Sequence, residues 1–304
     1  MNSSGGRTRG YMKQNKWLID RAKSLDDEAF VEFVGELTER SVDFEEKPND
    51  EIIHISEVES TEGKWISTGY STIDDKIRGL GQGHVILIGG ETSNGKSALA
   101  TNIAVNVSKK ESVLFITLEM VQHELKKRIE LCNNGTVDGL DISMQKQFRI
   151  TYKDLKPLFE RAKATKDIKL VVLDYLQYLG RGMTLDEVSR MSKEIKTLAL
   201  DFQIPVIVIV SLRKNEAGKN KRKWTEIEIE DLMGTASIGY DCDTAIIASR
   251  KDLENQFDPD HIYVKVLKTR NSAIDYHDRY IELDWKETKI TEDWSIPVKK
   301  AIDN

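Results

Sequence analysis

Cysteine is scarce in this sequence of 304 residues: only Cys132 and Cys242 occur, and they lie far apart in the chain. Such a pair predicts neither a disulfide framework nor a thiolate metal site. No apolar run approaches the ~20 residues that span a bilayer. The polar N-terminal stretch also lacks the apolar segment typical of a signal peptide. These absences predict a reducing, cytoplasmic location and no membrane partner.

A large excess of one charge is also missing. Charged residues make up 32% of the chain and hydrophobic residues 39%, while the net charge is only −6. These values are typical of a globular protein with a solvated surface, and they argue against a protein that coats nucleic acid over its whole surface. They are compatible with a local basic channel, because binding responds to local charge rather than to the total.

The chain is expected to divide into three segments. Residues 1–23 form a basic tail predicted to be flexible, residues 24–62 a linker helix with an acidic tether, and residues 63–304 a single α/β domain. In the second segment, "SLDDEAFVEFVGELTER" predicts a short amphipathic helical arm. Its apolar stripe consists of Phe30, Phe33, Val34 and Leu37. The stripe packs either on its own domain or on a neighbouring subunit, and the sequence leaves both open.

From residue 63 onward, apolar β-branched runs alternate with helical patterns. The runs are "HVILIGG", "SVLFITLE", "IKLVVLDY", "IPVIVIVS", "DTAIIASR", "IYVKVLKT" and "RYIELDW". Continuous apolar strands separated by helices predict a mostly parallel central sheet flanked by helices. In the helix expected near residues 184–202, Thr184 and Glu187 form a capping box. The apolar stripe of this helix consists of Leu185, Val188, Met191, Ile195 and Leu198.

The stretch "GGETSNGKSALA" at residues 89–100 fits the phosphate-binding pattern G-x-x-x-x-G-K-[ST]. It follows an apolar strand and precedes a helix, which is the context that the pattern requires. Backbone N–H groups and the helix N-terminus would hold phosphate oxygens. Lys96 would reach the β- and γ-phosphates, and the Ser97 hydroxyl would ligate Mg²⁺. The predicted nucleotide-binding residues of this loop are Gly90, Ser93, Asn94, Gly95, Lys96, Ser97 and Ala98.

Two carboxylates are candidates for the remaining chemistry. Asp174 ends the apolar strand in "LVVLDYLQ" and is predicted to hold Mg²⁺ together with Ser97. Tyr175 follows it, where many ATPases of this type carry their catalytic glutamate. Glu119, at the end of "VLFITLEM", is the alternative base, because the carboxyl ends of parallel strands meet at one edge of a sheet. Otherwise Glu119 is an ordinary surface residue at a strand end.

Several stretches together resemble the C-terminal motor domain of DnaB-like replicative DNA helicases, a family similar to the helicase half of phage primase-helicases. They are "STGYSTIDDKIRGLGQGHVILIGGETSNGKSALATNIA", "FITLEM", "LVVLDYLQYL", "EDLMGTASIGYDCDTAIIASR" and "VLKTRN". The resemblance implies a RecA-like P-loop NTPase fold, a ring of six subunits, and ATP with Mg²⁺ between neighbours. By this resemblance Lys96, Ser97 and Asp174 handle nucleotide and metal, and Glu119 is the base.

The resemblance also implies roles for residues on later strands. Lys268 and Arg270 of "VLKTRN" match a pair that reaches the site of the adjacent subunit, where an arginine stabilises charge on the transferring phosphoryl group. The plainer interpretation is a solvated strand end. Arg250 lies where some relatives contact the nucleobase. Ser211 occupies the position of a γ-phosphate sensor, where relatives carry glutamine or histidine.

The stretch "RKNEAGKNKRKWTE" concentrates basic residues in an otherwise acidic protein. Such a loop can grip the phosphate backbone of single-stranded DNA without sequence preference, or it can simply be a solvated loop. The predicted DNA-binding residues are Arg213, Lys214, Lys219, Lys221, Arg222 and Lys223, with Arg181 as a second, weaker candidate. Trp224 either stacks on a base or anchors the loop to the core, and the anchor is the simpler interpretation.

The leading hypothesis is an ATP-dependent ring that translocates on single-stranded DNA, 5′ to 3′ by the resemblance, and unwinds duplex during replication. A primase or helicase loader is the expected partner, and the location is the host cytoplasm if a phage encodes the chain. The alternative is a RecA-like DNA-binding ATPase scaffold, or a recombination or loader factor, without intrinsic unwinding. Ser211 keeps that alternative open, as does the lack of a primase module or collar domain before the motor. A small-molecule kinase fits less well.

Overall fold

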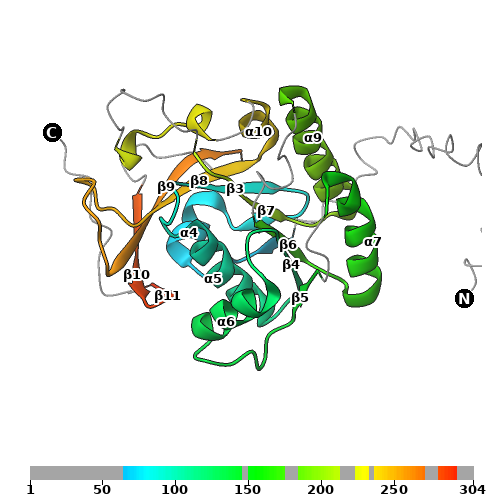
Figure 1. Ribbon diagram of the computed structural model, residues 1–304, viewed down its shortest axis with the longest axis horizontal. Helices are drawn as coiled ribbons and strands as arrows, with labels where there is room; N and C mark the ends of the chain where they lie inside the picture. The colour runs from blue at the N-terminus through cyan, green and yellow to red at the C-terminus, as the bar shows by residue number, and fades with distance from the viewer. Residues whose placement is uncertain are drawn as a thin grey trace, which may run out of the picture. The chain divides into compact units, whose positions relative to one another are not determined.

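The computed structural model describes residues 64–145, 150–174, 184–212, 223–232, 236–270 and 280–292 (Figure 1). All of them belong to the unit Thr61–Asn304. The predicted basic tail, helical arm and acidic tether, which together make up residues 1–62, lie outside the described residues.

The centre of the described part is a sheet of nine strands. Their bounds are β3 (Val85–Gly89), β4 (Val113–Thr117), β5 (Ile142–Met144), β6 (Leu170–Asp174), β7 (Val206–Ile209), β8 (Thr244–Ser249), β9 (His261–Thr269), β10 (Tyr280–Lys286) and β11 (Lys289–Thr291). The order across the sheet is β11-β10-β9-β8-β3-β7-β6-β4-β5. The strands from β8 to β5 pair in parallel, whereas β9, β10 and β11 pair antiparallel. A separate antiparallel pair joins β1 (Trp65–Ile66) and β2 (Leu80–Gly81).

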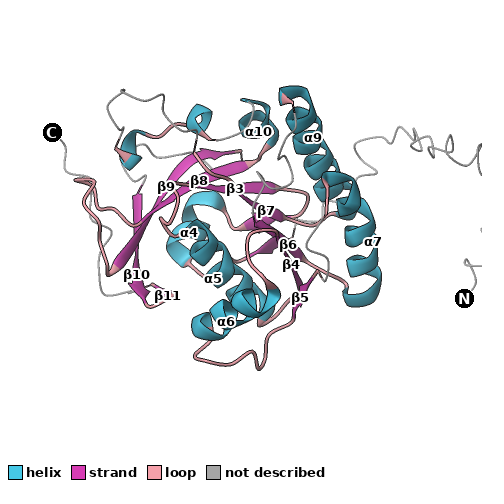
Figure 2. Ribbon diagram, viewed as in Figure 1, coloured by secondary structure: helices cyan, strands magenta, loops and turns pink. Residues whose placement is uncertain are grey.

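Helices cover both faces of this sheet (Figure 2). One face carries α4 (Ser71–Ile77), α5 (Lys96–Ser108) and α6 (Gln122–Cys132). The other carries α7 (Leu155–Lys166), α9 (Leu185–Phe202) and α10 (Ala236–Asp241). The described residues also include three short 3₁₀ turns: η2 (Tyr152–Asp154), η3 (Trp224–Glu226) and η4 (Ile229–Asp231). None of the helices in the described ranges has the length and apolar character needed to cross a membrane.

The strand sequences are continuously apolar because each strand is buried on both sides. In β3, Ile86 and Ile88 belong to the cluster that includes α5, while Val85 and Leu87 pack in the cluster that includes α9. Burying each of these side chains stabilises the fold by about 1.5–3 kcal/mol. The predicted parallel sheet with two helical layers is therefore confirmed.

The predicted helix near residues 184–202 is also confirmed as α9. The Thr184 hydroxyl accepts a hydrogen bond from the Glu187 N–H, and the Glu187 carboxylate accepts one from the Thr184 N–H. Of the predicted stripe, Met191, Ile195 and Leu198 are buried. The sequence interpretation missed β5 and β11, which are three residues each and lie at the two edges of the sheet.

The antiparallel strand β9 carries the chain back beside β8. Thr269 pairs with Thr244 and Lys268 with Ala245, at the amino end of β8. The parallel neighbour β3 ends instead in the phosphate-binding loop, at its carboxyl end. The last residues of β9 therefore lie at the amino ends of the parallel strands, opposite to that loop.

Candidate functional site

A cleft of about 550 Å³ lies at the edge of the sheet where β3, β4 and β7 end. Its walls come from the phosphate-binding loop, the segment after β4, α6, the end of β7 and the β10–β11 hairpin. Of the predicted site residues it is lined by Ser93, Gly95, Lys96, Ser97, Ala98, Glu119 and Ser211. The fold thus brings together residues that are widely separated in the sequence.

Two glycines are required by the shape of the phosphate-binding loop. Gly90 has a φ of 153°, and a Cβ atom there would collide with the carbonyl oxygen of Ala248. Gly95 has a φ of 89°, and its Cβ atom would come within 2.7 Å of the Ile262 side chain. Only glycine adopts these conformations at low cost in such tight surroundings. The pattern in the sequence therefore reflects backbone geometry.

Lys96 is buried at the start of α5, next to the cleft. Its Nζ atom donates a hydrogen bond to the carbonyl oxygen of Glu91, at 2.6 Å. Burial lowers the pKa of Lys96, and the carboxylates of Glu119 and Asp174 oppose that effect. Asn94, another predicted loop residue, is buried and donates to the Glu91 carboxylate. The loop therefore holds its lysine ready for an anionic ligand.

Ser97 and Asp174 meet as predicted. The Ser97 hydroxyl donates to Asp174 Oδ1 at 3.3 Å, while Asp174 Oδ2 is buried without a hydrogen-bond partner. Burial, and then the neighbouring Glu119 carboxylate, raise the pKa of Asp174 to about 7. A hard cation would satisfy the unpaired oxygen and remove the cost of the buried charge, so this donor set fits Mg²⁺.

The donor set is too small for a metal cage made by the protein alone. No group of three histidine, cysteine or acidic side chains that could hold a metal occurs in the residues that the structure describes. Mg²⁺ is usually held by one or two protein oxygens together with water and substrate phosphates. Ser97 and Asp174 match that pattern.

Glu119 lies two residues beyond β4 and faces the same cleft. Thr117, the last residue of β4, pairs with Asp174, the last residue of β6. This register places Glu119 close enough to Asp174 to influence its charge state. Glu119 thus lies at the cleft beside Asp174, and its role as a base stays a prediction.

The cleft-lining residues that the sequence interpretation did not assign include Arg128, Trp285 and Thr288. Arg128 lies on α6 and helps to lower the pKa of Asp174. Its neighbours Lys126 and Lys127 are also basic, so the sequence does not show which cation turns inward. Trp285 reaches the loop from β10, and only the folded sheet brings them together.

Arg250 does not line the cleft itself. Its guanidinium lies over the Trp285 ring at 4.1 Å and over the Phe257 ring at 5.3 Å. It also donates hydrogen bonds to the carbonyl oxygens of Asp258 and Pro259. Arg250 thus packs against Trp285, which lines the cleft, and a direct contact of Arg250 with a nucleobase stays a prediction.

Lys268 and Arg270 lie at the amino ends of the parallel strands, away from the cleft of their own chain. Lys268 Nζ donates to the carbonyl oxygens of Gly239, Tyr240 and Cys242 at 2.8, 3.1 and 2.7 Å. Arg270 donates to the Tyr240 carbonyl at 2.8 Å, and half of its side chain is exposed. If these cations act at a cleft of this kind, that cleft belongs to another subunit.

Most of the predicted DNA-binding residues lie outside the described residues: Arg181, Arg213, Lys214, Lys219, Lys221 and Arg222. Lys223 is described and exposed. Trp224 is 1% exposed, donates its indole N–H to the Asp252 carbonyl and packs against the rings of Tyr263 and Tyr280. Trp224 therefore anchors this end of the segment to the core and is not available to stack on a base.

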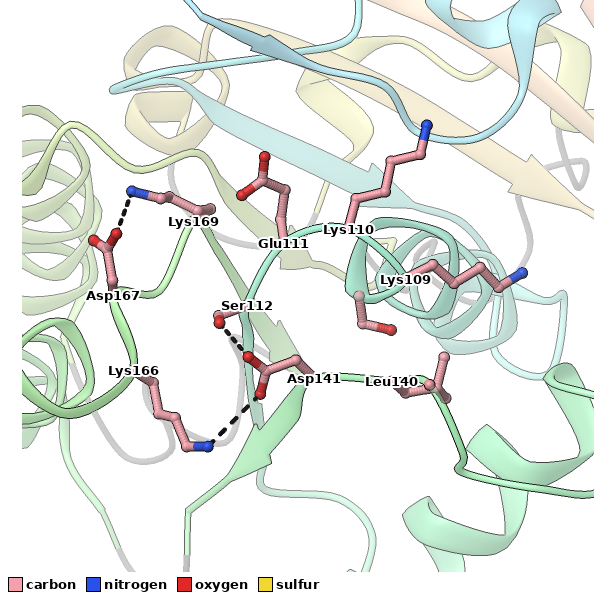
Figure 3. Close-up of a pocket in the computed structure, with 11 residues that line it drawn as sticks. Lys109, Lys110, Glu111, Ser112, Leu140, Asp141, Lys166, Asp167 and Lys169 are labelled. Atoms are coloured by element: carbon pink, nitrogen blue, oxygen red, sulfur yellow. Dashed lines mark hydrogen bonds and ion pairs between the residues drawn. The ribbon is translucent and has the colours of Figure 1, made fainter.

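A second hollow, of about 430 Å³, lies at the amino ends of β4, β5 and β6 (Figure 3). Four lysines line it, but Lys169 pairs with Asp167 at 2.7 Å and Lys166 with Asp141 at 4.0 Å. In Figure 3, the amines of Lys109 and Lys110 point away from the hollow. Its charges are therefore largely balanced, whereas the phosphate-binding loop lines the cleft at the carboxyl ends of the strands.

The sequence matches the family described as DnaB-like helicase C terminal domain in two overlapping segments, residues 65–151 and 133–289. It is 26% identical over 261 residues to the replicative DNA helicase DnaB of Geobacillus stearothermophilus. This match covers 74% of this chain and 56% of that protein. It is 25% identical over 242 residues to the DnaB of Leifsonia xyli subsp. xyli, covering 68% and 52%. The chain spans about half the length of the curated relatives it matches.

Two solved structures are similar in fold. One is a DnaB-like replicative helicase studied with its interactions with primase, with a TM-score of 0.70 and 18% identity over 94% of this chain and 77% of that chain. The other is a separate ATPase domain, with a TM-score of 0.65 and 17% identity over 78% of this chain and 94% of that domain. These likenesses establish the fold and confirm the predicted RecA-like architecture.

Proposed function

Because the chain belongs to the DnaB-like helicase C-terminal domain family, we propose that it is the ATP-driven motor of a replicative DNA helicase. One observation carries the proposal beyond the family assignment. The proposed nucleotide cleft lies at the carboxyl ends of the parallel strands, whereas the Lys268–Arg270 pair lies at their amino ends. A head-to-tail contact between copies would place the pair of one subunit at the cleft of the next.

Within one subunit, the loop residues supply the binding chemistry. Backbone N–H groups of the loop and Lys96 hold the phosphates, while Ser97 and Asp174 hold Mg²⁺. When bound, Mg²⁺ neutralises charge that develops on the phosphate oxygens. Glu119 orients the attacking water and accepts its proton. ATP is the proposed nucleotide.

The adjacent subunit completes the site. Arg270 supplies a guanidinium that stabilises negative charge on the transferring phosphoryl group, and Lys268 contributes a second cation beside it. Hydrolysis then depends on assembly. A heterologous contact of this kind forms a ring when the rotation between copies closes after a whole number of subunits without translation along the axis, and six copies is the proposed number.

The basic segment that follows β7 is the proposed contact with single-stranded DNA. Ser211 lies two residues beyond β7 and lines the cleft. The basic residues Arg213, Lys214, Lys219, Lys221, Arg222 and Lys223 follow it in the chain. Phosphate contacts give affinity without sequence preference, as translocation requires. Arg181 is a further candidate, and the proposed direction is 5′ to 3′.

The proposed partners are single-stranded DNA, further copies of this chain, and a primase or helicase loader. One of the structurally similar proteins is described together with primase, which supports the choice of that partner class. The proposed location is the cytoplasm, where such partners act on DNA.

Ser211 favours a second candidate function. A serine hydroxyl is shorter than the amide or imidazole that the family resemblance implies at this position, so it senses the γ-phosphate only at closer range or through water. A chain with weakened coupling would bind DNA and hydrolyse ATP as a RecA-like scaffold or loader without unwinding. DNA-stimulated hydrolysis without strand displacement would identify that function.

The test is ATP hydrolysis by the full chain with and without single-stranded DNA. We expect clear stimulation by DNA, and a loss of at least about a hundredfold in both Lys96→Ala and Arg270→Ala, since an arginine supplied in trans contributes 10³–10⁵ in rate. Lys156→Ala and Arg161→Ala, on the exposed part of α7, serve as matched controls. Activity that ignores DNA would refute the coupling to DNA, and activity that survives Arg270→Ala would refute the shared site.

A further inference from the structure

Asp243 is a buried carboxylate at the amino ends of the parallel strands, close to Lys268 and Arg270. It directly precedes β8, and its backbone is fixed on both sides. The Asp243 N–H donates to the Val85 carbonyl at 2.9 Å, and the Arg270 N–H donates to the Asp243 carbonyl at 3.0 Å. Asp243 therefore joins the start of β3 to the last residue of the K-x-R segment.

The Asp243 side chain is held as firmly as its backbone. Oδ2 accepts hydrogen bonds from the Val85 N–H at 2.8 Å and from Lys196 of α9 at 2.7 Å. Lys196 also donates to the Gly83 carbonyl at 2.9 Å. With Oδ2 occupied, Oδ1 is turned toward the guanidinium of Arg270, at 3.4 Å from Nη1.

We propose that Asp243 is a positioning residue that aims Arg270 at the active site of the adjacent subunit; this rests on the proposed function. Arg270 is attached to its own subunit at two points, the Asp243 carboxylate and the Tyr240 carbonyl. A half-exposed arginine without the carboxylate would sample many rotamers. The buried charge restricts that sampling, and the fixed strand contacts set the direction in which the guanidinium leaves the subunit.

The two groups that hold Arg270 belong to different parts of the fold, and only the Asp243 carboxylate is tied to the sheet. The carbonyl of Tyr240 belongs to the short helix α10, and Lys268 also binds carbonyls in and just after that helix. Asp243 belongs to the sheet and is fixed to β3 and α9. Asp243 therefore fixes the position of the Arg270 guanidinium relative to β3, the strand that leads into the phosphate-binding loop of the same subunit.

The experiment uses trans-complementation in rings formed by two co-expressed, differently tagged full-length variants. Asp243→Asn keeps one acceptor oxygen, which can still receive the Val85 N–H and Lys196, but it removes the charge and places an amide donor toward Arg270. It should reduce hydrolysis by about ten- to a hundredfold, the cost of a misplaced catalytic group. Its own nucleotide cleft stays intact. Lys96→Ala has a defective cleft but an intact Arg270. In mixed rings about a quarter of the interfaces combine an intact cleft with an intact Arg270, so activity should return.

Asp241→Asn is the matched control, because Asp241 lies two residues away but accepts a hydrogen bond from Ser192 of α9. It should hydrolyse ATP like the unmodified chain. If Asp243→Asn fails to fold, Lys196→Gln/Asp243→Asn removes both charges of the buried pair together and still leaves Arg270 without its carboxylate. The same loss and the same complementation are expected of that double variant.

Arg270→Ala mixed with Lys96→Ala provides the reference for a site shared between subunits. If that mixture regains activity and the Asp243→Asn mixture does not, Asp243 acts within its own subunit and the positioning role is wrong. Unreduced activity of Asp243→Asn would also overturn the proposal. If neither mixture regains activity, the shared site itself is refuted, and the role of Asp243 falls with it.

Discussion

Replacing Asp174 by asparagine is predicted to stabilise the nucleotide-free chain at pH 8 while abolishing Mg²⁺-dependent hydrolysis. Asp174 is 1% exposed, and its Oδ2 atom has no hydrogen-bond partner. Burial and the nearby Glu119 carboxylate raise its pKa from 3.8 to about 7. Asparagine preserves the shape of the side chain and removes a charge that these surroundings accommodate poorly without a cation.

The expected magnitude follows from this shift. Well below pH 4 the carboxyl is protonated in both the folded and the unfolded chain, and its burial then carries no charge penalty. As the pH rises toward 7 the unfolded chain loses the proton first, so stability falls, and above 7 the full penalty applies. A shift of about three pKa units corresponds to at most roughly 4 kcal/mol. At about 2–4 °C per kcal/mol, the variant should melt at most roughly 8–16 °C higher at pH 8.

Thermal unfolding of both chains between pH 5 and pH 8.5, without nucleotide or Mg²⁺, measures this difference. The gap between variant and unmodified chain should widen with pH, whereas Asp138→Asn, at an exposed position, should show no such trend. Adding Mg²⁺ with ADP at pH 8 should stabilise the unmodified chain more than the variant. A variant that is no more stable at pH 8, or a gap independent of pH, would refute the reasoning.

Three further variants test the phosphate-binding loop, the core and the proposed DNA contact. Gly90→Ala should weaken nucleotide binding at least about tenfold in a titration with a fluorescent ATP analogue, because its Cβ atom would meet the Ala248 carbonyl. Trp224→Ala should lower the free energy of unfolding in urea by about 3–5 kcal/mol, since it empties a fully buried site. Lys219→Ala/Lys221→Ala should weaken DNA binding and reduce the slope of log K against log salt by about 0.7 for each DNA phosphate that the variant no longer neutralises. An unchanged nucleotide affinity would contradict the role of Gly90, and an unchanged free energy of unfolding that of Trp224. An unchanged salt slope would contradict the DNA contact of the two lysines.

The sequence predicted the parts of the fold that depend on local pattern. The apolar runs indicated the long central strands, and the Thr184–Glu187 capping box indicated the start of α9. The strands β5 and β11 were missed because three residues are too few to show a period. Such edge strands exist only because a neighbouring strand offers them hydrogen bonds, and no local signal encodes that neighbour.

The candidate site divides in the same way. The loop around Lys96 is one continuous stretch, so its pattern is complete in the sequence, and Asp174 and Glu119 followed from their places at strand ends. The stacking of Arg250 on Trp285 was beyond this reasoning, since it depends on a tertiary contact between β10 and the segment after β8. The partners of Arg270 were equally hidden, because Asp243 is an ordinary acidic residue until β9 folds back beside β8.

The most direct test of the central claim is strand displacement on forked DNA by the full chain with ATP and Mg²⁺. We predict displacement that requires a 5′ single-stranded tail and is lost in Lys96→Ala. A chain that hydrolyses ATP in response to DNA but displaces no strand, with either a 5′ or a 3′ tail, would contradict the assignment as a helicase motor and favour the scaffold.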